Sequence, residues 1–248
     1  MRINFQSTKK EHTMIKLYSF GPAFNLIDAS PFVTKIDLFL RVNDISFESV
    51  PNVDNLQKSP KGKLPYIKDG NQIIADSTAI IEYLASHHNA SIDAWLSDEQ
   101  KATSHLISKS LDENLYWCLV HSRWVHEATW QIVKANYFDS MSFPMNKIVP
   151  IVARKQVRGS LKGHGMGKHT EDEITHIAQQ SFQSLSTLLA DKPYFFGEKI
   201  SSLDIVIFSH VASFTLASIN NPLNELARTF DNLVAFTQKT QNQYYPDL

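Results

Sequence analysis

The sequence predicts a two-domain α+β protein in which a small α/β domain precedes an all-helical domain. Three observations predict this class. The chain of 248 residues is longer than a single hydrophobic core usually organises. Short apolar runs separated by turn signals fill residues 14–88, whereas a helical period runs from residue 98 almost to the end. We therefore expect a disordered extension at 1–13, a first domain at 14–88 and a second at 95–248.

The first domain opens with a strand and a helix. An apolar, aromatic run begins at Ile15 and stops at Gly21-Pro22, which is typical of a strand. A helix is then predicted from Ser30-Pro31, because serine suits the N-cap and proline suits the first helical position. The apolar positions of this helix share one face: Phe32, Ile36, Phe39 and Leu40.

A second strand and a β-hairpin complete the sheet of this domain. Residues 45–50 alternate apolar and polar side chains, and a turn follows at 59–62. Residues 64–67 and 72–75 flank Asp69-Gly70, a dipeptide suited to a tight hairpin turn. Pro65 inside the first hairpin strand indicates either an edge strand or a cis peptide bond. Asp76-Ser77 then caps a helix that ends the domain.

The second domain is predicted to consist of amphipathic helices at 98–125, 127–140, 144–157, 171–190, 202–218 and 222–242. The four glycines of Gly159–Lys168 favour a mobile surface loop. Ser201 and Asp204 have the spacing of a capping box, with Ile200 and Ile205 as its hydrophobic staple.

Composition excludes several classes of function. The 24 basic and 25 acidic residues leave a formal charge of -1. The chain therefore lacks the positive electrostatic field that nucleic-acid-binding proteins use. No apolar run approaches the roughly 20 residues that span a bilayer, and no secretory signal is visible. Cys118, the single cysteine, lies in an apolar setting that predicts a buried structural thiol and fits a reducing cytoplasm. The ten histidines lack ligand spacing, so we expect no metal site.

The segment SPKGKLPYIKDGNQIIADSTAIIEYL, from Ser59 to Leu84, strongly resembles the glutathione-binding half of the glutathione transferase superfamily. The chain is similar to that superfamily over roughly residues 14–245. Within it, PAFNLIDASPF, LYWCLVHSRW and KPYFFGEKISSLD most resemble the branch of failed-axon-connections and metaxin-like proteins. The resemblance implies a thioredoxin-like N-terminal domain, a helical C-terminal domain, glutathione as co-substrate and a homodimer.

The resemblance also implies a glutathione site. The main chain of Leu64, followed by a cis Pro65, corresponds to the element that pairs with the cysteinyl part of glutathione. Asp76 and Ser77 correspond to the anchor for the γ-glutamyl end. A helix N-terminus and a serine hydroxyl suit its carboxylate, and Asp76 suits its ammonium group. Lys63 meets the glycyl carboxylate in one interpretation and is a solvated turn lysine in the other.

Ser30 is the catalytic candidate, since Ser30-Pro31-Phe32 resembles the Cys-Pro-Phe of omega-type transferases. A hydroxyl donor at a helix N-terminus favours a bound thiolate over the thiol. A simple N-cap is an equally weighted interpretation of this serine. The long loop at 21–29 separates Ser30 from the first strand, which leaves Tyr18 and Ser19 as weaker alternatives.

Four side chains of the long helix before residue 125 are candidates for a second-substrate pocket: Tyr116, Trp117, His121 and Trp124. The alternative, core packing, is favoured because aromatic stripes at helical spacing are usually buried.

Three functions follow from these residues and the resemblance. The first is a transferase that conjugates glutathione to a small electrophile, with its thiolate stabilised by Ser30. The alternative is a noncatalytic binding or scaffold module of metaxin type, which the loop at 21–29 favours. The third is a glutathione-dependent thiol-disulfide reductase, against which serine in place of a nucleophilic cysteine at position 30 argues.

Overall fold

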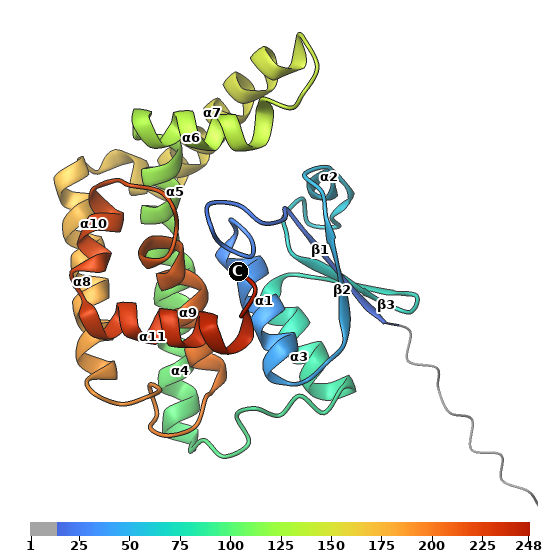
Figure 1. Ribbon diagram of the computed structural model, residues 1–248, viewed down its shortest axis with the longest axis vertical. Helices are drawn as coiled ribbons and strands as arrows, with labels where there is room; N and C mark the ends of the chain where they lie inside the picture. The colour runs from blue at the N-terminus through green and yellow to red at the C-terminus, as the bar shows by residue number, and fades with distance from the viewer. Residues whose placement is uncertain (1–13) are drawn as a thin grey trace, which may run out of the picture.

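The computed structural model describes residues 14–248, so the extension predicted at 1–13 lies outside the described residues. A small sheet covered by helices lies beside a larger group of helices (Figure 1). This is the predicted arrangement of an α/β domain followed by a helical domain, and it is confirmed.

The sheet contains four strands in the order β2-β1-β3-β4. Their bounds are β1 Ile15–Ser19, β2 Phe47–Pro51, β3 Tyr66–Asp69 and β4 Gln72–Ala75. Strand β1 pairs parallel with β2 and antiparallel with β3, and β3 and β4 form the predicted hairpin. Pro51 ends an edge strand, where a missing backbone N–H costs no ladder bond. The Leu64-Pro65 bond that enters β3 is cis.

Two helices of this domain, α1 (Pro31–Val42) and α3 (Ser77–His87), pack against each other, and α1 lies between the sheet and the helical domain (Figure 1). Both sides of α1 are therefore covered, and the residues from Val33 to Leu40 are buried. A short helix, α2 (Asn55–Lys58), escaped prediction because four residues carry no readable period. The buried Asn55 side chain holds it by donating to the carbonyls of Ser19 and Val50.

The helical domain begins with α4 (Asp98–Ser110), the π-helical turn η1 (Leu111–Leu115) and α5 (Tyr116–Trp124), which follow one another without a break. The remaining elements are α6 Glu127–Phe138, α7 Met145–His164, η2 Met166–Lys168, α8 Glu171–Leu189, α9 Ser202–Thr215, α10 Pro222–Arg228 and α11 Asp231–Tyr244. Helix α9 is the centre of the core, since every residue from Leu203 to Thr215 is buried. It packs against α1, α4, α10 and α11.

Two predictions about the helical domain are wrong. The mobile loop predicted at Gly159–Lys168 is mostly helix, because α7 continues to His164 and is anchored by the fully buried Leu161. Tertiary packing thus outweighs the roughly 1 kcal/mol that each helical glycine costs. Only Gly165, with φ of 109°, leaves the helical conformation and ends the helix. The helix predicted at 222–242 is divided into α10 and α11.

The predicted pairing of Ser201 and Asp204 is present at the start of α9. The Asp204 carboxylate accepts hydrogen bonds from the Ser201 N–H at 2.8 Å and the Phe195 N–H at 2.8 Å. It also accepts the Ser201 hydroxyl. This buried carboxylate joins the central helix to the loop before it, so its role is structural.

Candidate functional site

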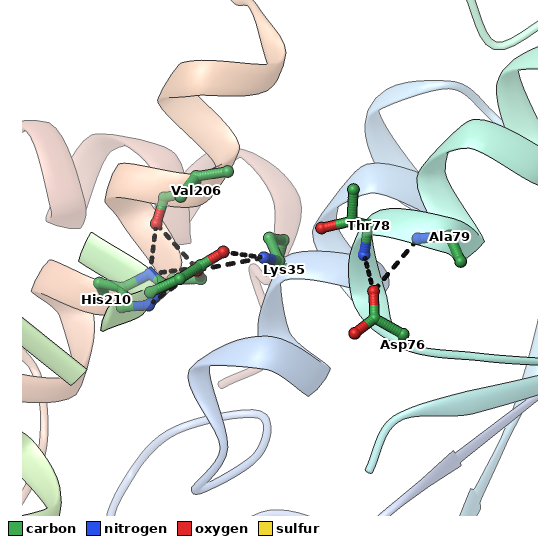
Figure 2. Close-up of polar contacts among 8 residues, drawn as sticks. Lys35, Asp76, Thr78, Ala79, Val206 and His210 are labelled. Carbon is green, nitrogen blue, oxygen red and sulfur yellow. Dashed lines mark hydrogen bonds and ion pairs between the residues drawn. The ribbon is translucent and has the colours of Figure 1, made fainter. Parts of the chain in front are cut away.

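The N-terminus of α3 is built around Asp76. Its Oδ1 atom accepts the backbone N–H groups of Thr78 at 2.9 Å and Ala79 at 3.3 Å, as Figure 2 shows. Asp76 has φ of 91° and ψ of 128°, a conformation that non-glycine residues rarely adopt. Such strain persists where the surrounding structure imposes it, and it clusters at binding sites. Asp76 therefore uses one carboxylate oxygen for its own helix.

Ser77 follows as the first residue of α3 and is 7% exposed. Within residues 14–248, no hydrogen bond engages its hydroxyl or the Oδ2 atom of Asp76. A hydroxyl donor and a carboxylate acceptor thus lie on adjacent residues at the positive end of a helix dipole. A ligand that carries both an ammonium and a carboxylate group matches this pair.

Leu64 lies just before the sheet, at the entrance to β3. Its side chain is buried, while β3 pairs with β1 only from Tyr66 onward, so the Leu64 main chain lies outside the ladder. The preceding turn is fixed by the Ser59 hydroxyl, which donates to the Lys63 carbonyl at 2.5 Å. The Lys63 side chain itself is exposed. We call Leu64, Pro65, Asp76 and Ser77 the cradle.

Ser30 lies at the start of α1, but its hydroxyl forms no capping hydrogen bond. Ser30 therefore holds the predicted N-cap position before Pro31, but the expected capping bond of its hydroxyl is absent. The Ser30 backbone N–H instead donates to Asp28 at 2.8 Å. Among the weaker candidates, Tyr18 stacks on Tyr66 with ring centroids 4.2 Å apart, and the Ser19 hydroxyl is buried without a hydrogen-bond partner in the described chain.

The loop between β1 and α1 is closed by Asp28, a residue that the sequence analysis missed. Its carboxylate accepts the Gly21 N–H at 2.7 Å at one end of the loop and the Ser30 N–H at the other. Asp28 is only 1% exposed, and this burial raises its pKa to about 7, although the backbone N–H groups oppose the shift. The two ends of the loop are thus held by one side chain.

The same loop is docked on the helical domain. Arg123 of α5 is buried and donates to the Ala29 carbonyl at 2.6 Å and to the Ser213 carbonyl at 3.2 Å. The Ser218 N–H donates to the Phe24 carbonyl at 2.8 Å, and the Phe24 ring contacts Tyr137 edge to face. The loop therefore occupies space between the two domains.

A second contact between the domains is a buried ionic cluster of Lys35 (α1), Asp112 (η1) and His210 (α9). Lys35 Nζ lies 3.3 Å from Asp112 Oδ1, and His210 Nε2 lies 3.4 Å from the same oxygen. Burial lowers the pKa of Lys35 and lowers the pKa of His210 to about 4, so the imidazole is neutral at pH 7. Figure 2 shows Lys35 between His210 and the start of α3. The cluster therefore joins α1 to η1 and α9 of the helical domain.

The four candidates for a second-substrate pocket do not face one common space. The Tyr116 ring contacts Phe32 of α1, whereas Trp117 stacks on His164 of α7 and Trp124 packs on Trp130 of α6. Burial lowers the pKa of the half-buried His121. All four side chains are partly buried, and their role as a second-substrate pocket or as core packing stays a prediction.

Cys118 is fully buried, and burial raises the pKa of its thiol to about 12. The prediction of a buried structural thiol is confirmed, since so little thiolate forms at neutral pH. In residues 14–248, no group of three histidine, cysteine or acidic side chains has the arrangement of a metal site. No helix in the described chain is long and apolar enough to cross a membrane.

Comparison with known families and proteins matches both halves of the chain. The family described as Glutathione S-transferase N-terminal domain matches residues 31–129, and Glutathione S-transferase, C-terminal domain matches residues 178–240. Among solved structures, the beta-etherase LigF from Sphingobium sp. strain SYK-6 has a TM-score of 0.64 at 20% identity and covers 92% of this chain and 95% of its own. The predicted fold is thereby confirmed.

Three curated proteins are similar over most of this chain. Isoprene-epoxide--glutathione S-transferase of Rhodococcus sp. (strain AD45) is 31% identical, with 93% of this chain and 99% of the relative covered. Human metaxin-2 is 27% identical over 86% of this chain and 81% of its own length. Failed axon connections of Drosophila melanogaster is 29% identical over 99% of this chain, which spans 62% of that relative.

These relatives also correct one prediction. The cytoplasmic location inferred from a single cysteine is wrong, because the metaxins and Failed axon connections give that compartment no support. A reduced thiol excludes an oxidising compartment more readily than it selects among reducing ones. The resemblance to a metaxin-like branch is confirmed, and the chain belongs to the glutathione S-transferase family.

Proposed function

We propose that the protein is a noncatalytic glutathione-transferase-like binding module. In this proposal the cradle holds glutathione, with Ser77 and the N-terminus of α3 at the γ-glutamyl carboxylate. Asp76 Oδ2 accepts the ammonium group, the Leu64 main chain pairs with the cysteinyl part, and Lys63 meets the glycyl carboxylate. The docked faces of the two domains form a binding scaffold, and the protein is a homodimer.

The observation that carries the proposal is the packed loop at residues 21–29. An electrophile must reach the glutathione sulfur from the space between the domains, next to Ser30. Here Asp28 closes the loop and Arg123 docks it on the helical domain. The rings of Phe24 and Tyr137 fill the region behind it. The similarity to metaxin-2 and Failed axon connections favours the same conclusion.

Calorimetric titration with reduced glutathione tests the binding half of the proposal. We expect saturable binding to the parent protein and a loss of about 1 to 3 kcal/mol for Ser77→Ala, the usual cost of a hydrogen bond to a charged group. The matched control is Ser86→Ala on the same helix, whose hydroxyl donates to the Glu82 carbonyl and lies far from the N-terminus. Absence of binding at millimolar glutathione, or equal affinity in both variants, would contradict the cradle.

A second candidate function is conjugation of glutathione to a small electrophile by Ser30. Two observations favour it: the 31% identity to a glutathione S-transferase named for an isoprene epoxide, and a Ser30 hydroxyl that no capping bond consumes. Initial rates with an aryl chloride and with an epoxide, at saturating glutathione, separate the two functions. The binding module gives rates equal to the solution reaction, whereas the transferase gives rates that fall with Ser30→Ala.

A further inference from the structure

The exposed side of α7 combines apolar and basic side chains. Five large apolar residues, one just before α7 and four in its first half, are 47% to 81% exposed: Phe143, Met145, Ile148, Ile151 and Val152. Their spacing of three or four residues along the helix places Met145, Ile148 and Val152 on one side. Side chains of this size are normally buried, so a contiguous exposed group marks an interaction surface.

Cations accompany this apolar row. Lys147, Lys155, Arg158 and Lys162 are exposed on the same helix, and no acidic residue occurs between Asp139 and Glu171. Of the described cations on α7, only Arg154 has an ion pair, with Glu127 at 2.9 Å. The local charge therefore differs sharply from the formal charge of -1 of the whole chain.

The surface is also hollowed and prominent. A groove of about 600 Å³ lies between α6 and α7, lined by Trp130, Lys134, Lys147, Pro150, Ile151, Arg154, Lys155 and Arg158. Figure 1 shows that the end of α6 and the beginning of α7 extend beyond the rest of the helical domain.

We propose that this α7 surface docks on an anionic lipid membrane, with the apolar row in the interface and the cations at lipid phosphates. Helices with exposed apolar residues beside lysine and arginine bind anionic membrane surfaces in this manner. The positive charge of the α7 surface favours an anionic membrane over a second copy of the chain as its binding partner. A two-fold contact through the same surface would oppose the cations of one copy to those of the other.

Flotation of the full chain with lipid vesicles tests this proposal. We expect binding to vesicles of phosphatidylcholine that contain about 30% of the anionic lipid phosphatidylglycerol. We expect little binding to vesicles of phosphatidylcholine alone. The pair Lys155→Glu and Arg158→Glu should lower partitioning by ~10-fold or more. The pair Ile148→Ser and Ile151→Ser should lower it by a similar factor while leaving the charge intact.

The matched control carries the same change of charge elsewhere, Lys58→Glu with Lys199→Glu, two exposed lysines outside α7. It should bind vesicles like the parent, and circular dichroism checks that every variant is folded. A Phe143→Trp reporter gives an independent readout, because its emission should be quenched by brominated lipids. The proposal would be overturned by equal binding to neutral and anionic vesicles, or by unchanged binding of the α7 variants. It would also be overturned if the parent bound no vesicles and formed a dimer that these variants dissociate.

Discussion

The cradle and the loop at residues 21–29 lie in the same domain but differ in their polar groups. The cradle leaves polar groups without hydrogen bonds, whereas the loop uses its polar groups in hydrogen bonds within the protein. At the cradle, the Ser77 hydroxyl and Asp76 Oδ2 form no hydrogen bond within the described chain. In the loop, both oxygens of Asp28 accept backbone N–H groups, and the Ala29 carbonyl accepts Arg123. In the proposed function, the half of the site that binds glutathione stays available while packing closes the half that would react.

The largest effect that sharpens this comparison is expected for Arg123→Ala. The change removes two charge-assisted hydrogen bonds and leaves the buried carbonyls of Ala29 and Ser213 unpaired, so unfolding should become easier by about 4 kcal/mol. The loop should also become accessible, which limited proteolysis and amide hydrogen exchange over residues 21–29 measure.

The control for this variant is Arg228→Ala, which removes an arginine that donates to the carbonyls of Thr215, Ala217 and Ile219. It should lower the free energy of unfolding without raising exchange in the loop. Protection of the loop that is the same in Arg123→Ala and in the parent would show that Arg123 does not hold it.

A smaller, pH-dependent effect is expected at Asp28. The pKa of Asp28 is about 7 in the folded protein and 3.8 in the unfolded chain, so the folded state binds the extra proton. Stability from this group is therefore present at low pH and is lost as the pH rises through 7. Relative to Asp28→Asn, the parent should lose about 2 kcal/mol between pH 5 and pH 7.

Urea unfolding of both proteins at pH 5 and pH 7 measures this difference. The buried His210 acts in the opposite direction below pH 6.5, because its pKa is lowered to about 4 and only the unfolded chain takes up the proton. It is common to both proteins and cancels in the comparison. A parent-minus-variant difference that is constant with pH would contradict the burial of the Asp28 carboxylate.

Two local features near the proposed glutathione site agree with the sequence-based expectations because their geometry is local. The cis Leu64-Pro65 bond and the cap at Asp76 are both set within a few neighbouring residues. The closure of the loop depends instead on Arg123, 94 residues from Ala29, and the ionic cluster joins Lys35 to Asp112 across 77 residues. Nothing in the spacing of these charged residues indicates such partners.

The same distinction explains one error in the helical domain and one at the start of α1. The glycines of α7 carry a strong local signal for a loop, but the buried side chain of Leu161 fixes that segment as helix. At Ser30, residue type and the following proline predicted a cap, whereas Asp28 determines how the chain enters α1. Local patterns therefore predict the elements of this fold better than the contacts between them.

The smallest expected effect is that of Ser30→Ala on stability. Its hydroxyl forms no capping bond, so we expect a change below about 0.5 kcal/mol, as for an ordinary partly exposed side chain. The matched comparison is Thr170→Ala at the start of α8, where the hydroxyl accepts the Glu173 N–H and the loss should be about 1 kcal/mol. Thermal unfolding of both variants measures the two losses of stability. Equal losses would show that the Ser30 hydroxyl does cap α1.

The central claim is that glutathione occupies the cradle while its sulfur receives no activation from the loop or from Ser30. Its most direct test is the ultraviolet absorbance of the glutathione thiolate, titrated against pH in the saturated complexes of the parent and Ser30→Ala. The account predicts superimposable curves whose midpoint equals that of free glutathione, close to the ordinary thiol pKa of about 8.5. A midpoint lowered by about one unit or more in the parent, corresponding to ~1.4 kcal/mol, and restored in Ser30→Ala would contradict it and identify the protein as a transferase.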